Sequence, residues 1–125
     1  MIYSDNDFIL GMQQGFVDCA EWYEGETIIE YDEFTSYQNG NGFSSEATQQ
    51  IDDIVKEFYE ANKALLIESE LTPEQCGHDL FLTANGHGAG FWDRGIDEIG
   101  DKLTEACQKY NFHIYANDSG LLEIE

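Results

Sequence analysis

Apolar residues recur at helical spacing in three stretches of the chain, which predicts three helices that each bury one face. The first stretch runs from residue 5 to about residue 23, the second from a cap at Ser44 or Ser45 to about residue 68, and the third from residue 96 to about residue 110. In the third, acids stand in the first turns and lysines later, the order that the helix dipole favours. The apolar positions are Phe8, Met12, Phe16, Ala20 and Tyr23; Ile51, Ile54, Val55, Phe58, Ala61 or Asn62, Leu65 and Leu66; and Ile96, Ile99, Leu103, Ala106, Cys107 and Tyr110.

The pattern changes between residues 70 and 95. Residues 72–75, Thr-Pro-Glu-Gln, form a capping-box pattern with proline at the first helical position, which predicts one short turn that Gly77 ends. Residues 78–83 are apolar enough for a buried strand, and the Asn-Gly pair at 85–86 is a tight-turn signal. We therefore expect a strand and a chain reversal in this part of the sequence.

The C-terminal end predicts a closing hairpin, because apolar segments at 112–115 and 121–124 flank Asn-Asp-Ser-Gly at 117–120. Residues 24–43 combine a β-prone patch with a glycine-containing polar run, which predicts a loop or an irregular strand.

Together these patterns predict one α+β domain over residues 1–125, a length typical of a single domain. We expect about three helices packed on a small, mainly antiparallel sheet that comes from the C-terminal half. Residues 1–70 are expected to be mainly helical and acidic, and residues 71–125 to supply a strand, a hairpin, a helix and the closing hairpin.

The cysteines and the N-terminus favour a cytoplasmic protein. Cys19, Cys76 and Cys107 are odd in number and show no CxxC spacing, so we expect buried free thiols rather than disulfides or nucleophiles. Residues 1–5 lack the basic and apolar parts of a signal peptide. Apolar runs such as 64–67 are far shorter than the roughly 20 residues that span a bilayer, so no membrane segment is expected.

The net charge of the chain limits the kinds of partner that it can bind. The chain has 26 acidic and 5 basic residues, a net charge of -21, which opposes direct binding to nucleic acid or to an anionic membrane and favours a basic partner. Because 42% of the residues are apolar and 14% aromatic, a disordered acidic tail is excluded. Residues 1–55 contain twelve acids and no lysine or arginine.

Two helical rows of carboxylates stand out, Asp18-Glu21-Glu24 and Asp53-Glu57-Glu60. Like charges at such spacing destabilise a helix by roughly 0.2–0.5 kcal/mol per pair, so folding alone gives no reason for them. Carboxylates in a line can occupy the basic groove of a DNA- or RNA-binding protein, which is nucleic-acid mimicry. Two plainer explanations are a solvated face that keeps the protein soluble and adaptation to a high-salt cytoplasm. The expected contact set is Asp18, Glu21, Glu24, Glu26, Glu30, Asp32, Glu33, Asp52, Asp53, Glu57 and Glu60.

Residues 78–94 hold two of the three histidines, the single arginine and three spaced glycines. A phosphate cradle is rejected, because the spacing fits neither GxGxxG nor a P-loop and no lysine follows. His78, His87 and Asp93 match neither HExxH nor a Cys/His finger, so we expect no metal and no other cofactor. A hydrolase would use His87 as base and Arg94 to stabilise an anion, but no activated serine or cysteine accompanies them.

A structural role explains the same segment more fully, so we expect no enzyme. Glycines let the chain turn tightly, and the aromatic pair Phe91 and Trp92 can anchor one face of the core. A single arginine in so acidic a chain should be partly buried and paired, and Asp79 and Asp93 are its candidate partners.

The segment resembles a group of small acidic proteins encoded in bacteriophage and prophage genomes. The match covers about residues 78–110, roughly a quarter of the chain, and the matching residues are Gly77-His78-Asp79, Asn85 through Arg94 and Gly100 through Ala106. Leu80 and Ala84 depart from the pattern, where the group usually has an aromatic and a basic residue. The resemblance implies a phage accessory protein in an infected bacterial cytoplasm and supplies no catalytic residue.

Three functions follow as hypotheses. The first is an acidic inhibitor that blocks a host nucleic-acid-binding protein, such as a defence, repair or recombination factor, by mimicry. The second is a small hydrolase or ligand-binding protein that uses His78, His87, Asp93 and Arg94. The third is an adaptor that binds a basic partner by ordinary protein contacts, with Phe34, Tyr37 and Phe43 as exposed anchors.

Overall fold

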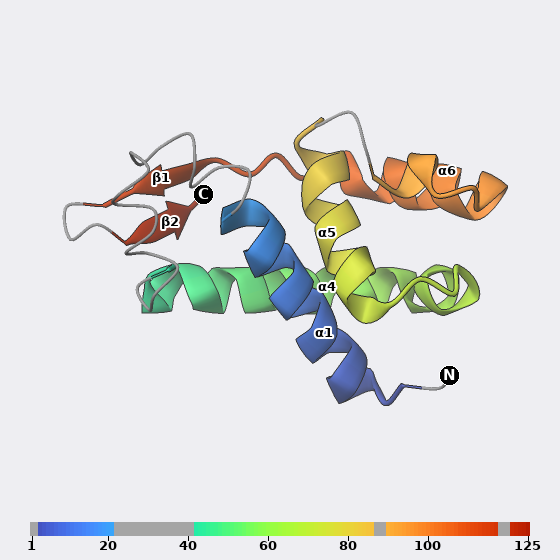
Figure 1. Ribbon diagram of the computed structural model, residues 1–125, viewed down its shortest axis with the longest axis horizontal. Helices are drawn as coiled ribbons and strands as arrows, with labels where there is room; N and C mark the ends of the chain where they lie inside the picture. The colour runs from blue at the N-terminus through green and yellow to red at the C-terminus, as the bar shows by residue number, and fades with distance from the viewer. Residues whose placement is uncertain (1–2, 22–41, 87–89, 118–120) are drawn as a thin grey trace.

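The computed structural model describes residues 3–21, 42–86, 90–117 and 121–125 (Figure 1). These residues form an α+β arrangement that is mostly helical, with one two-stranded antiparallel sheet. The elements are helices α1 (Asp5–Ala20), α4 (Ser45–Glu68), α5 (Pro73–Ala84) and α6 (Asp97–Cys107), the 3₁₀ turn η2 (Phe91–Asp93), and strands β1 (Ile114–Ala116) and β2 (Leu122–Ile124).

Hydroxyl caps define where three of the helices begin. The side chains of Ser4, Ser44 and Thr72 each accept a hydrogen bond from a backbone N–H in the first turn of the helix that follows. Each cap satisfies one of the backbone donors that a helix start leaves without a partner. The expected cap of the long helix is thus confirmed at Ser44.

Helices α1 and α5 pack closely against each other, and glycines allow this close approach. A methyl group added at Gly15 would stand 2.0 Å from the carbonyl oxygen of Glu74, and one added at Gly77 would stand 2.1 Å from that of Met12. No real carbon tolerates such distances, so both positions require glycine for the two backbones to meet. Gly15 therefore allows α1 to pack against α5.

The core lies where α1, α4, α5 and α6 meet and extends under the hairpin. Phe16 packs edge-on against Phe81 and Phe112, and the rings of Phe58 and Phe91 stack at 6.1 Å between centroids. In Figure 1 the long helix α4 lies behind α1 and α5, and its N-terminal end lies beside the hairpin, whose strand β2 contacts it. Phe43 forms an isolated parallel bridge with Leu122 on the same sheet.

The predicted strand at 78–83 is wrong. These residues belong to α5, which continues through Gly77 because that glycine is the contact point with α1 rather than a helix stop. The Asn-Gly pair at 85–86 ends the helix: the Asn85 N–H donates to the carbonyl of Phe81, and Gly86 follows at φ 65°. The described residues therefore contain four α-helices rather than three, and the helices pack on one another more than on the sheet.

Several finer expectations are also settled. The closing hairpin is confirmed, with Ile114 opposite Ile124 and Tyr115 opposite Glu123. The first helix ends at Ala20, and the third predicted helix ends at Cys107 rather than near 110. All but two residues of the expected loop at 24–43, together with Tyr23, lie outside the described residues.

All three cysteines are free and buried, as expected. None of the described helices is both long enough and apolar enough to cross a membrane.

Candidate functional site

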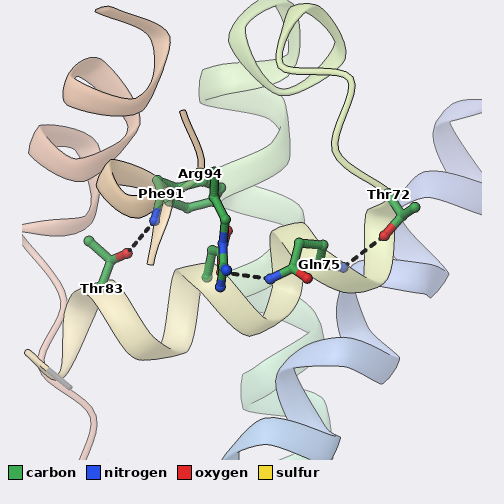
Figure 2. A network of polar contacts seen from close by, with 6 residues as sticks. Thr72, Gln75, Thr83, Phe91 and Arg94 are labelled. Carbon is green, nitrogen blue, oxygen red and sulfur yellow. Dashed lines mark hydrogen bonds and ion pairs between the residues drawn. The ribbon is translucent and has the colours of Figure 1, made fainter. Parts of the chain in front are cut away.

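Arg94 and Asp79 form a buried ion pair at the centre of residues 78–94. The Asp79 side chain is completely buried, and that of Arg94 is 28% exposed. Arg94 donates from Nε to both carboxylate oxygens, at 3.2 and 3.0 Å, and from Nη2 to Oδ1 at 2.7 Å. Gln75, one turn before Asp79 on α5, donates to Oδ1 at 2.9 Å. Figure 2 shows the Arg94 and Gln75 side chains directed towards the same place beside α5, where both donate to Asp79.

This geometry confirms the expected clamp and selects Asp79 over Asp93 as the partner. A buried carboxylate is tolerated only when donors replace its lost water, and here a guanidinium fork and an amide do so. The guanidinium is engaged by the fold, which opposes a role for Arg94 in stabilising a substrate anion.

The turn that carries Arg94 is fixed to α5 by Thr83. The Phe91 N–H donates to the Thr83 hydroxyl at 3.2 Å, as Figure 2 shows. Gly90 stands at φ 146°, and a methyl group on it would lie 2.0 Å from the same hydroxyl oxygen, so glycine is required there. Phe91 then enters the core, whereas Trp92 is 51% exposed. The expectation that Trp92 anchors the core is therefore wrong, because only the first ring of the pair points inward.

Asn85 ties the end of α5 to the C-terminal part of the chain. Its side-chain amide donates to the Phe112 carbonyl at 2.9 Å, and its side-chain oxygen accepts from the Phe112 N–H at 2.9 Å. These two bonds satisfy both backbone groups of a residue that precedes β1. Asn85 is thus bonded to the segment before β1, while Phe91 and Arg94 are bonded to α5.

The three thiols are held in their protonated form by the fold. Burial raises the pKa of Cys19, Cys76 and Cys107 to about 12, and the charge of Asp79 acts in the same direction. Because the thiolate is the reactive form, none of these cysteines is suited to nucleophilic chemistry near neutral pH.

Three of the four residues of the alternative site, His78, Asp93 and Arg94, lie within the described residues. His78 lies half-exposed on α5, Asp93 is exposed on η2, and His87 lies outside the described residues. In the described part of the chain no group of three His, Cys, Asp or Glu side chains could hold a metal ion.

The first carboxylate row is described only in part. Asp18 is exposed and accepts a hydrogen bond from Gln14 at 2.8 Å. Glu21 is half-buried at the end of α1, where burial and then the charge of Asp18 raise its pKa. The remaining members of the expected contact set in this region, Glu24, Glu26, Glu30, Asp32 and Glu33, lie outside the described residues.

The second row, Asp53-Glu57-Glu60, lies exposed along α4. Together with Lys56 and Ala61 it lines a shallow hollow of about 590 Å³. Glu57 accepts from Lys109 at 2.8 Å and from the Tyr110 hydroxyl at 2.7 Å, which lowers its pKa. Part of its charge is therefore already matched within the fold.

Asp52, beside this row, is half-buried. Its pKa is raised by burial and then by the charge of Asp53.

Most of the other acidic side chains on described residues face solvent. Among the described residues Asp79 alone is buried; Glu21, Asp52 and Glu123 are half-buried. Ion pairs between described residues hold three of the five bases, Lys63 with Asp5, Lys109 with Glu57 and Arg94 with Asp79. The exposed acids are Asp5, Asp7, Asp18, Glu46, Asp53, Glu57, Glu60, Glu68, Glu70, Glu74, Asp93, Asp97, Glu98, Asp101, Glu105 and Glu125.

Two contacts of the site are not predicted by the sequence pattern. Gln75 reaches Asp79 only because both lie on one helix four residues apart, so assigning a strand to 78–83 hid the pair. Asn85 was interpreted as a turn residue, although its side chain bonds to a residue 27 positions away. The proposed adaptor anchor Phe43 is half-buried against the core, and Phe34 and Tyr37 lie outside the described residues.

No family model, no curated protein and no solved structure matches this chain.

Proposed function

We propose that this protein is an acidic inhibitor that occupies the nucleic-acid-binding groove of a basic protein in the cytoplasm of an infected bacterium. The observation that carries the proposal is the placement of charge. Of the carboxylates on described residues, all except Asp79 reach the surface at least in part, while three of the five bases are already paired. The negative charge of the described residues is therefore presented outward, where it complements a cationic groove.

The internal polar chemistry supports the same choice over an enzyme. Arg94 holds the buried Asp79, and the three thiols have a pKa of about 12. These are features of a scaffold, so Arg94, Asp79 and the three cysteines serve the fold.

The experiment is capture from bacterial lysate at low salt, repeated with excess duplex DNA as competitor. A binding partner that DNA displaces and that salt elutes supports mimicry, because such a contact has the electrostatic signature of the nucleic acid it replaces. A partner that remains bound in the presence of excess DNA would contradict it.

Two charge-reversal variants make the test position-specific. Asp18→Lys/Asp53→Lys/Glu60→Lys changes exposed members of the contact set, and Glu98→Lys/Asp101→Lys/Glu105→Lys changes three exposed acids of α6. Both alter the net charge equally. We expect the first to weaken partner binding at least about tenfold more than the second, because like charges across an interface are costly. Equal weakening would show that overall charge, and not this contact set, is responsible.

One observation favours a second candidate, the adaptor. Trp92 is 51% exposed, and tryptophan is enriched among the residues that contribute most to binding at protein interfaces. If the captured partner is indifferent to DNA but is lost in Trp92→Ser, the adaptor replaces the mimic.

A further inference from the structure

Asn85 is followed by Gly86, a sequence with its own covalent chemistry. An asparagine in front of a glycine deamidates readily, because glycine leaves its backbone nitrogen free to approach the preceding side chain. The Gly86 nitrogen attacks the side-chain carbonyl carbon of Asn85, loses its proton, and expels ammonia to form a cyclic succinimide. Water then opens the ring to aspartate or isoaspartate, so one water is consumed and one ammonia released.

Gly86 is open to solvent. Gly86 is exposed, and no heavy atom beyond its chain neighbours lies within 4 Å of the position where a side chain would begin. Water therefore has direct access to Gly86.

The hydrogen bonds of Asn85 oppose the reaction. Both side-chain atoms are held by the backbone of Phe112, each at 2.9 Å, so the amide cannot rotate towards the chain without breaking both bonds. The attacking nitrogen is also occupied, because the Gly86 N–H donates to the Thr83 carbonyl at 3.3 Å. With ψ of 5° at Asn85, the backbone does not present Gly86 to the side chain.

We propose that Asn85 is a site of spontaneous deamidation that its contact with Phe112 suppresses. Reaction follows when the segment before β1 leaves the end of α5. The product then prevents its return, because a carboxylate has no N–H to offer the Phe112 carbonyl and repels it. Each molecule that opens here and reacts thereby loses the attachment between α5 and the C-terminal hairpin irreversibly.

The test compares rates at Asn85 by peptide mapping with mass spectrometry during incubation at mildly alkaline pH. The folded full-length chain and a synthetic peptide of residues 81–91 are followed in parallel. Two neutral hydrogen bonds must open first, so we expect the folded chain to react roughly 10- to 30-fold more slowly than the peptide. Asn39 and Asn41 also precede glycines and lie outside the described residues, so each site is quantified separately.

Phe112→Ala weakens the packing of the retaining segment and should bring the rate at Asn85 several-fold closer to that of the peptide. If this variant does not fold, the parent chain in urea below its unfolding transition serves instead, and the rate should rise before circular dichroism changes. A folded chain that reacts at the rate of the peptide would overturn the proposal. Acceleration only in step with global unfolding would overturn it as well.

Discussion

Replacing Arg94 is the most informative perturbation of the fold. Asp79 is completely buried, and its carboxylate depends on Arg94 and Gln75 for hydrogen bonds. Arg94→Met leaves that charge without its cation, Arg94→Lys keeps a cation but loses the planar fork, and Asp79→Leu/Arg94→Met removes both charges together.

The magnitudes follow from burial. Breaking a buried pair by removing one partner costs about 3–5 kcal/mol, so Arg94→Met should lower the melting temperature by roughly 12–20 °C. Arg94→Lys should cost about 1–3 kcal/mol, because a lysine cannot reproduce the contacts that Nε and Nη2 make together. The double variant should be more stable than Arg94→Met alone, since no unpaired charge remains in the core.

Urea unfolding followed by circular dichroism measures these differences. Lys102→Met is the matched control, because it removes one positive charge from an exposed position of α6 and should change stability by less than about 0.5 kcal/mol. If Arg94→Met unfolds at the same urea concentration as the control, the buried pair does not hold the fold together and the reasoning fails.

Further predictions concern packing and the thiols. Gly15→Ala and Gly77→Ala should each cost about 1–3 kcal/mol or more in urea unfolding, because the added methyl would stand 2.0 or 2.1 Å from a backbone oxygen of the opposing helix; unchanged midpoints would refute the contact. Cys19, Cys76 and Cys107 should resist a thiol reagent in the folded protein and all react in denaturant; fast modification of the native chain would contradict their burial. Burial raises the pKa of these thiols from 9.0 to about 12. Their contribution to the free energy of unfolding is therefore complete below pH 9.0 and is lost as the pH rises towards about 12. A free energy of unfolding that stays constant across that range would argue against this contribution.

The sequence predicts the elements whose signal is local. Helix α4 and the closing hairpin were expected close to their observed positions, because an apolar face at helical spacing and paired apolar segments around a turn are complete within the segment. The local pattern does not predict helix α5, because the residues that make it continue as a helix do so through contacts with another helix. Gly77 signals a helix end locally, yet it is glycine because Met12 of α1 passes against it, and a short apolar run such as 78–83 fits strand and helix alike.

The site follows the same division. That Arg94 would be paired could be argued from composition alone, since a single arginine among 26 acids has little reason to stay free. That its partner is fully buried and shared with Gln75 depends on α5 being a helix. Phe91 is buried and Trp92 is exposed because of the direction of a three-residue 3₁₀ turn, and a hydrophobic pattern cannot predict the direction of so short an element.

The central claim is that the exposed carboxylates of this protein occupy the nucleic-acid-binding groove of a basic partner protein. The direct measurement is a titration of the captured partner, bound to a fluorescent DNA duplex, with this protein at several salt concentrations. The account predicts that DNA is released with no ternary complex, and that the affinity of the protein falls with salt as that of DNA does. A stable ternary complex, or an affinity indifferent to salt, would contradict it.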